Sequence, residues 1–103
     1  MTNYLIEFGA DKIPVDDFLE LELREAGEDH KDVVILYYVD GSETKNLKAE
    51  FANYQLAKRW FSREAQHIAH VFDTKYGRYY INLYHAHAGP KSMILKNDGE
   101  LTL

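Results

Sequence analysis

The feature that most constrains the fold is an apolar run at residues 33–39 that ends at the dipeptide Asp40-Gly41. Asp-Gly between two strand-like segments is a strong hairpin signal, because the turn needs residues with positive φ. Residues 44–51 follow and alternate between polar and apolar side chains, which predicts the return strand. The chain therefore contains an antiparallel hairpin.

The register of this hairpin predicts a sheet with two apolar faces. Residues directly opposite in a hairpin share a face, so Leu47, Ala49 and Phe51 share one with a row of the preceding strand. A two- or four-residue loop selects the even positions 34–38, and a three-residue loop selects the odd positions 33–39. Both rows are apolar, so the second face needs a cover. We expect Tyr37, Tyr80 and Tyr84 on that face, covered by the C-terminal hairpin, a second copy or a partner protein.

Residues 14–26 carry two conflicting signals. Leu19 to Leu23 alternate like a strand. Pro14 suits a helix start, Gly27 suits a helix end, and the intervening composition favours a helix. We predict a helix, although Glu22 falls inside its apolar arc; a strand over residues 18–25 would leave a sheet with one helix.

A second helix is predicted over residues 54–66. Asn53 is a favourable N-cap. Helical spacing puts one apolar arc toward the core and the basic side chains toward solvent. The predicted buried arc is Leu56, Ala57, Trp60 and Phe61.

The remaining elements complete a single α+β domain over residues 1–103. Residues 4–8 predict a first strand, residues 68–73 and 79–85 predict a second hairpin turning near Gly77, and residues 93–95 predict an edge strand. The predicted fold is an antiparallel sheet of four to six strands with two helices packed on one face. Its order, βαββαββ, resembles the ferredoxin-like arrangement with an added C-terminal hairpin.

Composition narrows the setting and the possible partners. The chain has no cysteine, which excludes disulfides and thiolate metal sites and suits a reducing compartment. No signal peptide or membrane span is visible, so we expect a cytoplasmic protein with no membrane partner.

The net charge is −5, and residues 1–32 hold 10 acidic against 3 basic residues. This acidity disfavours general nucleic-acid binding and suits a partner with a basic surface, although acidic surfaces also serve solubility. The candidate contact residues are Asp16, Asp17, Glu20, Glu25, Glu28 and Asp29.

Catalytic and metal-binding motifs are weak in this sequence. Four of the five histidines fall in two pairs, His67 with His70 and His85 with His87, which the second hairpin would bring together. No carboxylate lies beside His85 or His87, although metal-bound histidines usually have such a partner. No nucleophile elbow, phosphate loop or dinucleotide-binding glycine motif is present. We therefore expect no metal, no cofactor and no enzymatic activity.

These observations favour a small acidic protein-interaction domain, with a homodimer through the sheet as one possibility. Small acidic cysteine-free chains resemble, in type, the phage and mobile-element proteins that inhibit host complexes, including nucleic-acid-binding defence complexes. The alternatives are a ferredoxin-like small-molecule regulatory domain, a nucleic-acid-binding protein and a metal-dependent protein.

Overall fold

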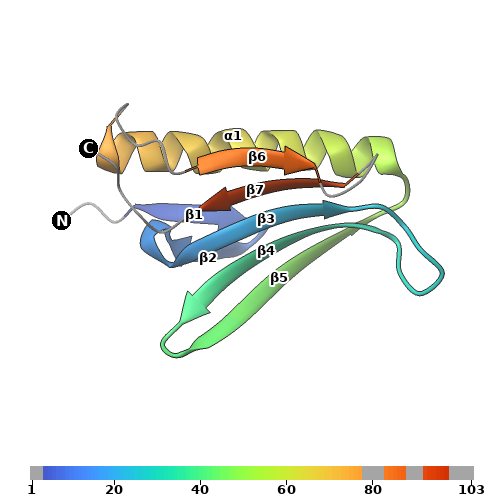
Figure 1. The fold of residues 1–103 in the computed structure, drawn as a ribbon, viewed down its shortest axis with the longest axis horizontal. Helices are drawn as coiled ribbons and strands as arrows, with labels where there is room; N and C mark the ends of the chain where they lie inside the picture. Colours follow the sequence, from blue (N-terminus) through green and yellow to red (C-terminus); the bar gives the residue numbers. More distant parts are fainter. Residues whose placement is uncertain (1–3, 78–82, 88–91, 98–103) are drawn as a thin grey trace.

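The computed structural model describes residues 4–77, 83–87 and 92–97. In these residues one long helix lies along one face of a sheet, as Figure 1 shows. The elements in chain order are β1 (Leu5–Phe8), β2 (Asp11–Pro14), the 3-10 turn η1 (Val15–Asp17), β3 (Phe18–Arg24), β4 (Asp32–Asp40), β5 (Glu43–Phe51), α1 (Tyr54–Tyr76), β6 (Leu83–His87) and β7 (Met93–Asn97).

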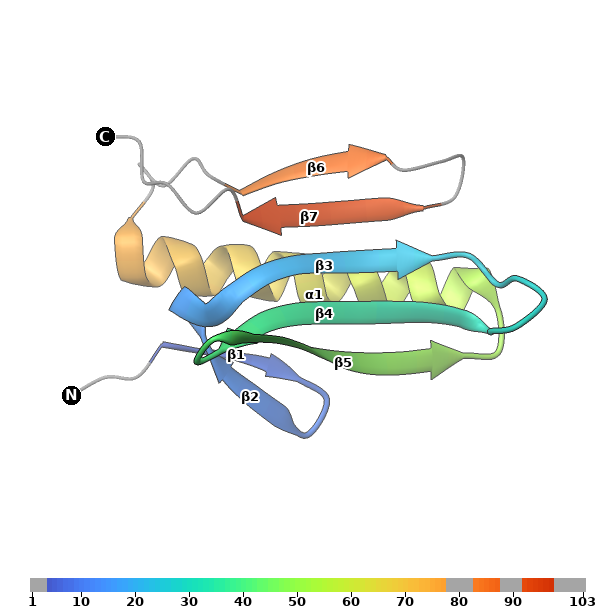
Figure 2. The same cartoon turned by 60° about the horizontal axis from the view of Figure 1, so that its bottom comes forward.

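The main sheet has five antiparallel strands in the order β5-β4-β3-β7-β6, and β1 and β2 form a separate hairpin. Figure 2 shows β6 and β7 on one side of β3, with β4 and β5 on the other. The antiparallel α+β prediction is confirmed. The predicted pair of helices and the ferredoxin-like βαββαββ order are not found, because the described residues contain a single α-helix.

The predicted helix over residues 14–26 is wrong, since most of this segment is the central strand β3. Phe18, Leu21 and Leu23 are fully buried, whereas Glu20 and Glu22 lie on the other face. A helix would have placed Glu22 inside its apolar arc. The two-residue period therefore prevails over helix propensity, because strand pairing buries the leucines and leaves the carboxylates on the face away from the core.

A register shift between Phe18 and Glu20 lets β3 bury Phe18 and Leu21, which are three residues apart, on the same face. Phe18 pairs with Tyr38 and Glu20 pairs with Tyr37, so one extra residue, Leu19, is accommodated on β3. Without this bulge, Phe18 and Leu21 would point to opposite faces, because side chains alternate along a strand. The bulge thus keeps Phe18 in the core.

Helix α1 starts where the sequence predicts but continues ten residues further, to Tyr76. The Asn53 side chain accepts a hydrogen bond from the Leu56 amide at 3.0 Å, which confirms the predicted N-cap. At the other end Gly77 has a φ of 81° and donates its N–H to the Asp73 carbonyl.

The second predicted hairpin is correspondingly wrong. Residues 68–73 lie in α1, where Ile68, Val71 and Phe72 recur at helical spacing and are buried. Gly77 ends the helix and does not form the predicted hairpin turn. Of the predicted return strand 79–85, residues 79–82 lie outside the described residues, and β6 begins at Leu83. The predicted edge strand is β7, which is internal and pairs with both β3 and β6.

The core lies between α1 and one face of the sheet. The β4–β5 hairpin has a two-residue loop, Gly41-Ser42, so Val34 pairs with Ala49 and Leu36 with Leu47, in the predicted register. The β1–β2 hairpin adds apolar side chains to the same core. Leu56, predicted to be buried, is 43% exposed. The largest fully buried side chains are Phe18, Phe61, Ile6, Leu21, Leu23, Leu36, Ile68, Val15 and Val34.

Candidate protein-interaction surface

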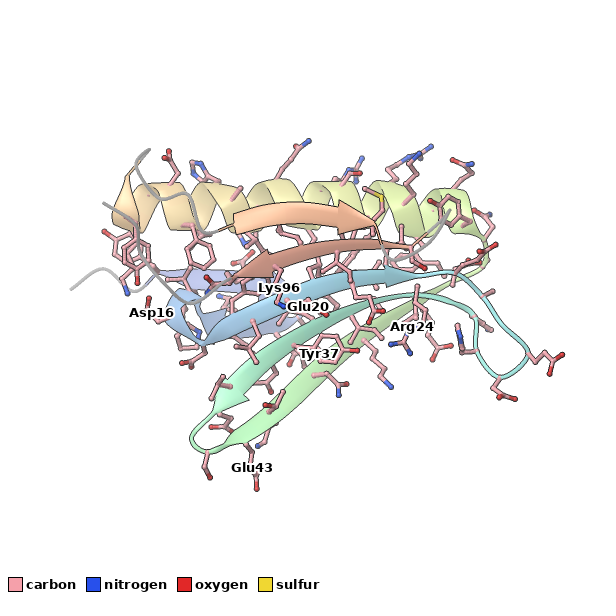
Figure 3. The ribbon with its side chains drawn as sticks, viewed as in Figure 1. Asp16, Glu20, Arg24, Tyr37, Glu43 and Lys96 are labelled. Carbon is pink, nitrogen blue, oxygen red and sulfur yellow. The ribbon has the colours of Figure 1, made fainter. Side chains whose placement is uncertain are left out.

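The sheet face that points away from α1 is the broadest candidate surface, and we call it the open face. Strand pairing places its side chains in cross-strand rows such as Lys48–Ile35–Glu22 and Asn46–Tyr37–Glu20. No helix or strand among the described residues packs on this face (Figures 1 and 3). The open face comprises Glu20, Glu22, Arg24, Val33, Ile35, Tyr37, Val39, Thr44, Asn46, Lys48, Glu50, Ile94 and Lys96.

Two apolar residues of the open face are almost completely removed from solvent. Val33 is 6% exposed and Ile35 is 2% exposed, although neither faces the helix. Their cross-strand neighbours on β3 and β5 are long charged residues, whose aliphatic stems cover apolar surface while the charged ends stay solvated. Val33 and Ile35 therefore do not need the predicted cover by a C-terminal hairpin, a second copy or a partner. Among the described residues Leu56, on the helix, is the one large hydrophobic side chain that is exposed.

A hydrogen-bonded cluster of Tyr37, Glu22 and Arg24 lies on the open face of β3 and β4, and Figure 3 labels its members Tyr37 and Arg24. The Tyr37 hydroxyl donates to Glu22 Oε1 at 3.0 Å. Arg24 donates to both oxygens of the same carboxylate, from Nη2 at 3.0 Å and from Nε at 3.3 Å. Burial and then the bond to Glu22 raise the pKa of Tyr37, so the hydroxyl stays a donor. The bidentate ion pair holds both side chains in one arrangement.

Glu20 extends the cluster toward β7. Burial and repulsion from Glu22 raise the pKa of its carboxyl, and Lys96, directly opposite on β7, acts in the other direction. A shallow cleft of about 180 Å³ lies at the other end of the face, over Val33 and Ile35. The open face thus combines charged groups of both signs with a small apolar floor.

The predicted acidic residues do not form a single surface. Asp16 and Asp17 lie in η1, before β3, whereas Glu25, Glu28 and Asp29 are exposed in the loop after it. A seven-residue strand separates the two groups by about 25 Å. Glu20 belongs to neither group and lies on the open face.

Asp16 is engaged within the protein. Its carboxylate accepts hydrogen bonds from Lys75 Nζ and from the Tyr76 hydroxyl at the end of α1. The bond from Lys75, followed by that from Tyr76, lowers the pKa of Asp16. This residue connects η1 to the helix end.

The predicted tyrosines are only partly within the described residues. Tyr37 is half-buried on the open face. Tyr84 lies in β6 and is paired with Lys96 in the register, and Tyr80 lies outside the described residues.

The two histidine pairs are not on the two strands of one hairpin, which was the arrangement that suggested a metal site. His67 and His70 are on α1, and His67 Nε2 accepts a hydrogen bond from the Glu7 amide at 2.9 Å. His85 and His87 lie in β6, of which the backbone is described. Among the described residues no group of three or more histidine, aspartate or glutamate side chains is placed to hold a metal ion.

Glu64 is a candidate site residue that sequence reasoning missed, and its carboxyl has the most strongly raised pKa among the described acids. It is 8% exposed, and burial, with repulsion from Glu7 as the second cause, raises its pKa to about 7. The signal was available: Glu64 lies seven residues after Ala57 and three after Phe61, inside the apolar arc of the helix.

No family model, curated protein or solved structure matches this chain. Within the part of the chain that the structure describes, no helix is apolar and long enough to span a membrane.

Proposed function

We propose that this chain is a protein-interaction domain that binds a partner protein through the open face. The observation that carries the proposal is the hydrogen-bonded Tyr37–Glu22–Arg24 cluster on a face where no described element packs. Tyrosine and arginine are enriched among the residues that dominate binding energy at protein interfaces. Because these side chains are already ordered by Glu22, a partner meets them at a low cost in conformational entropy.

The area of the open face is smaller than a standard interface, so neighbouring residues are expected to contact the partner as well. Five strands about 4.8 Å apart and roughly 23 Å long give on the order of 500 Å², while a standard interface uses about 800 Å² on each side. The β3–β4 loop adjoins the face and extends beyond the end of the sheet (Figure 2). We therefore include its exposed residues Glu25, Glu28 and Asp29 in the proposed contact region.

The charges favour a partner with a basic rim. On the open face Glu20, Glu22 and Glu50 are balanced by Arg24, Lys48 and Lys96. The excess negative charge is in the loop, which would steer a basic surface toward the face. Basic surfaces are typical of nucleic-acid-binding proteins. Inhibition of such a complex, as in a phage or mobile-element protein that blocks a host defence complex, is the specific form of this proposal.

Position-specific photo-crosslinking in cells tests the proposal. A photoreactive amino acid at Lys48, on the open face, should crosslink the partner, whereas the same amino acid at Lys58, exposed on α1, should not. The partner is then titrated with purified variants. We expect Tyr37→Ala to weaken binding at least tenfold and Lys58→Ala to change it less than twofold. A partner crosslinked from Lys58 alone would contradict the proposal, and crosslinking of Lys48 to a second copy of the chain would replace it with a homodimer.

A further inference from the structure

A second concave site lies on the helix side of the sheet, away from the open face. It is a cleft of about 320 Å³ between the β1–β2 hairpin and the first half of α1. Its lining residues are Glu7, Gly9, Trp60, Arg63, Glu64 and His67. Nothing in the proposed protein-binding function uses this cleft.

Glu64 gives the cleft an unsatisfied acceptor. The residue is 92% removed from solvent, and its Oε2 atom has no hydrogen-bond partner among the described residues. Buried polar atoms are almost always paired with protein or water, so Glu64, which lines the cleft, keeps capacity to accept a further hydrogen bond. Glu7 lies close enough to raise the pKa of Glu64 by repulsion, so the cleft has a second acidic group.

His67 fixes the position of β1 beside the helix. Its Nε2 atom accepts the Glu7 amide hydrogen, so in the neutral ring the proton is on Nδ1. This bond satisfies an N–H at the free edge of β1 and keeps the wall that carries Glu7 against the wall that carries Glu64. The cleft is therefore a formed site and not a gap between loosely joined elements.

Trp60 provides an ordered aromatic wall. Its ring makes an edge contact with Phe8, with centroids 4.8 Å apart, and a tilted contact with Phe51 at 5.6 Å. The faces of tryptophan rings attract cations, and they also pack on aliphatic chains. An acceptor that lacks a donor and an aromatic wall are the two parts of a site for an organic cation.

We propose that this cleft binds an ammonium or guanidinium group, with the charge received by Glu64 and the aliphatic stem packed on Trp60. A metal ion is disfavoured because the described residues offer no cluster of three ligands. An anion is disfavoured by the two carboxylates. The charged and titratable groups around the site are Glu7 on β1, Lys12 on β2, which pairs with Glu7 at 3.8 Å, and Arg63, Glu64 and His67 on α1.

The affinity of this site for a cation should depend on pH, because the Glu64 carboxyl must be ionised. The free carboxyl of Glu64 has a pKa of about 7, and the cation binds its ionised form. About one tenth of the carboxyl is ionised at pH 6 and about nine tenths at pH 8. Affinity should therefore rise about tenfold between these pH values, with release of a proton on binding.

The single tryptophan makes the test direct, because Trp60 is the only one in the sequence and lines the cleft. The full chain is titrated with methylammonium or methylguanidinium chloride at constant ionic strength, and Trp60 fluorescence is recorded at pH 6 and pH 8. N-acetylated and C-amidated Gly-Lys-Gly and Gly-Arg-Gly form a second arm, with Gly-Gln-Gly blocked in the same way as the neutral control, because a free N-terminus would itself be an ammonium group. Tighter binding of the peptides identifies a side chain of another protein as the source, and tighter binding of the free cations identifies a small amine or guanidine.

Matched variants separate site binding from nonspecific effects. Glu64→Gln should reduce affinity at least tenfold. Glu43→Gln, which changes a carboxylate at the β4–β5 turn that does not line the cleft, should leave affinity unchanged. If Glu64→Gln fails to fold by circular dichroism, the pH dependence of the unmodified chain decides. A fluorescence change that does not saturate, that sodium chloride reproduces, or that is equal at pH 6 and pH 8 would overturn the proposal.

Discussion

Glu22 and Glu64 are both carboxylates that the fold removes largely from water, but their surroundings differ. The Glu22 side chain is 15% exposed and accepts hydrogen bonds from Tyr37 and from two nitrogens of Arg24. Glu64 is 8% exposed, and one of its oxygens has no hydrogen-bond partner in the part of the chain that the structure describes. The first carboxylate organises a surface within the protein, and the second is left for a ligand. Burial alone does not define a site; what decides is whether the protein itself completes the hydrogen bonds.

The largest expected effect is a change in the free energy of unfolding, and it tests whether one core supports both the open face and the cleft. Phe61 is 1% exposed on α1 and packs among the buried side chains that join the helix to the sheet. Phe61→Ala should lower the free energy of unfolding by about 3–5 kcal/mol, because it leaves a cavity. Urea unfolding measures this, with Leu56→Ala as the exposed control on the same helix, at less than about 1 kcal/mol. Equal losses in the two variants would mean that α1 is rotated about its axis.

The next prediction separates the two carboxylates by pH. The pKa of Glu64 is raised from 4.5 to about 7 in the folded chain, so the folded state binds more protons than the unfolded state in this range. Its contribution to stability, about 3 kcal/mol, is full below pH 4.5 and is lost as the pH rises through 7. Unfolding at a series of pH values from 4.5 to 8 should show this decline.

Two variants sharpen that measurement. In Glu64→Gln the decline should largely vanish, since the amide does not titrate. In Glu22→Gln it should persist, because Glu64 is unchanged. If the curves of the Glu64→Gln and unmodified chains are parallel, Glu64 is not the group that titrates.

A smaller effect tests the open-face cluster. Tyr37→Phe removes the hydroxyl that donates to Glu22 and should cost about 0.5–1.5 kcal/mol. In a double-mutant cycle with Glu22→Gln, the double variant should lose less stability than the sum of the two single variants. The difference measures the coupling between the two residues. Tyr38→Phe, on the other face of β4, is the matched control. Strictly additive effects would show that Tyr37 and Glu22 are not coupled in solution.

The smallest effect concerns a third carboxylate, Asp16. Its side chain is 53% exposed, so its pair with Lys75 is screened by water, and Asp16→Asn should cost less than about 1 kcal/mol. Because its pKa is lowered in the folded state, this contribution is present above the unfolded pKa near 4 and is lost at lower pH. Added salt should reduce the difference from the unmodified chain, and Asp17→Asn is the neighbouring control. A cost that does not respond to salt would mean that Asp16 acts through hydrogen bonds to Tyr76 instead.

Local signals were sufficient for some elements and misleading for others. Asp40-Gly41 and the alternation of residues 44–51 predicted the β4–β5 hairpin with its register, and Asn53 predicted the start of α1. Gly77 was interpreted as a hairpin turn, although positive φ is equally suited to a helix end. The site was less accessible: Tyr37 was placed on the correct face, but Glu64 was missed although it lies within the predicted helix 54–66, because only the packing of that helix shows that its carboxylate is buried near Glu7.

The sequence by itself determined the α+β class, the antiparallel β4–β5 pairing and the two-faced character of β4, because turn chemistry and side-chain alternation act between near neighbours. Tertiary structure decided three things: residues 18–24 became the central strand, β7 was inserted beside it, and charged neighbours covered Val33 and Ile35. Each of these depends on contacts between segments far apart in the chain. Strand pairing and burial against α1 outweighed the helix propensity of residues 14–26, since propensity contributes only tenths of a kcal/mol per residue while burial of one leucine contributes about 2 kcal/mol.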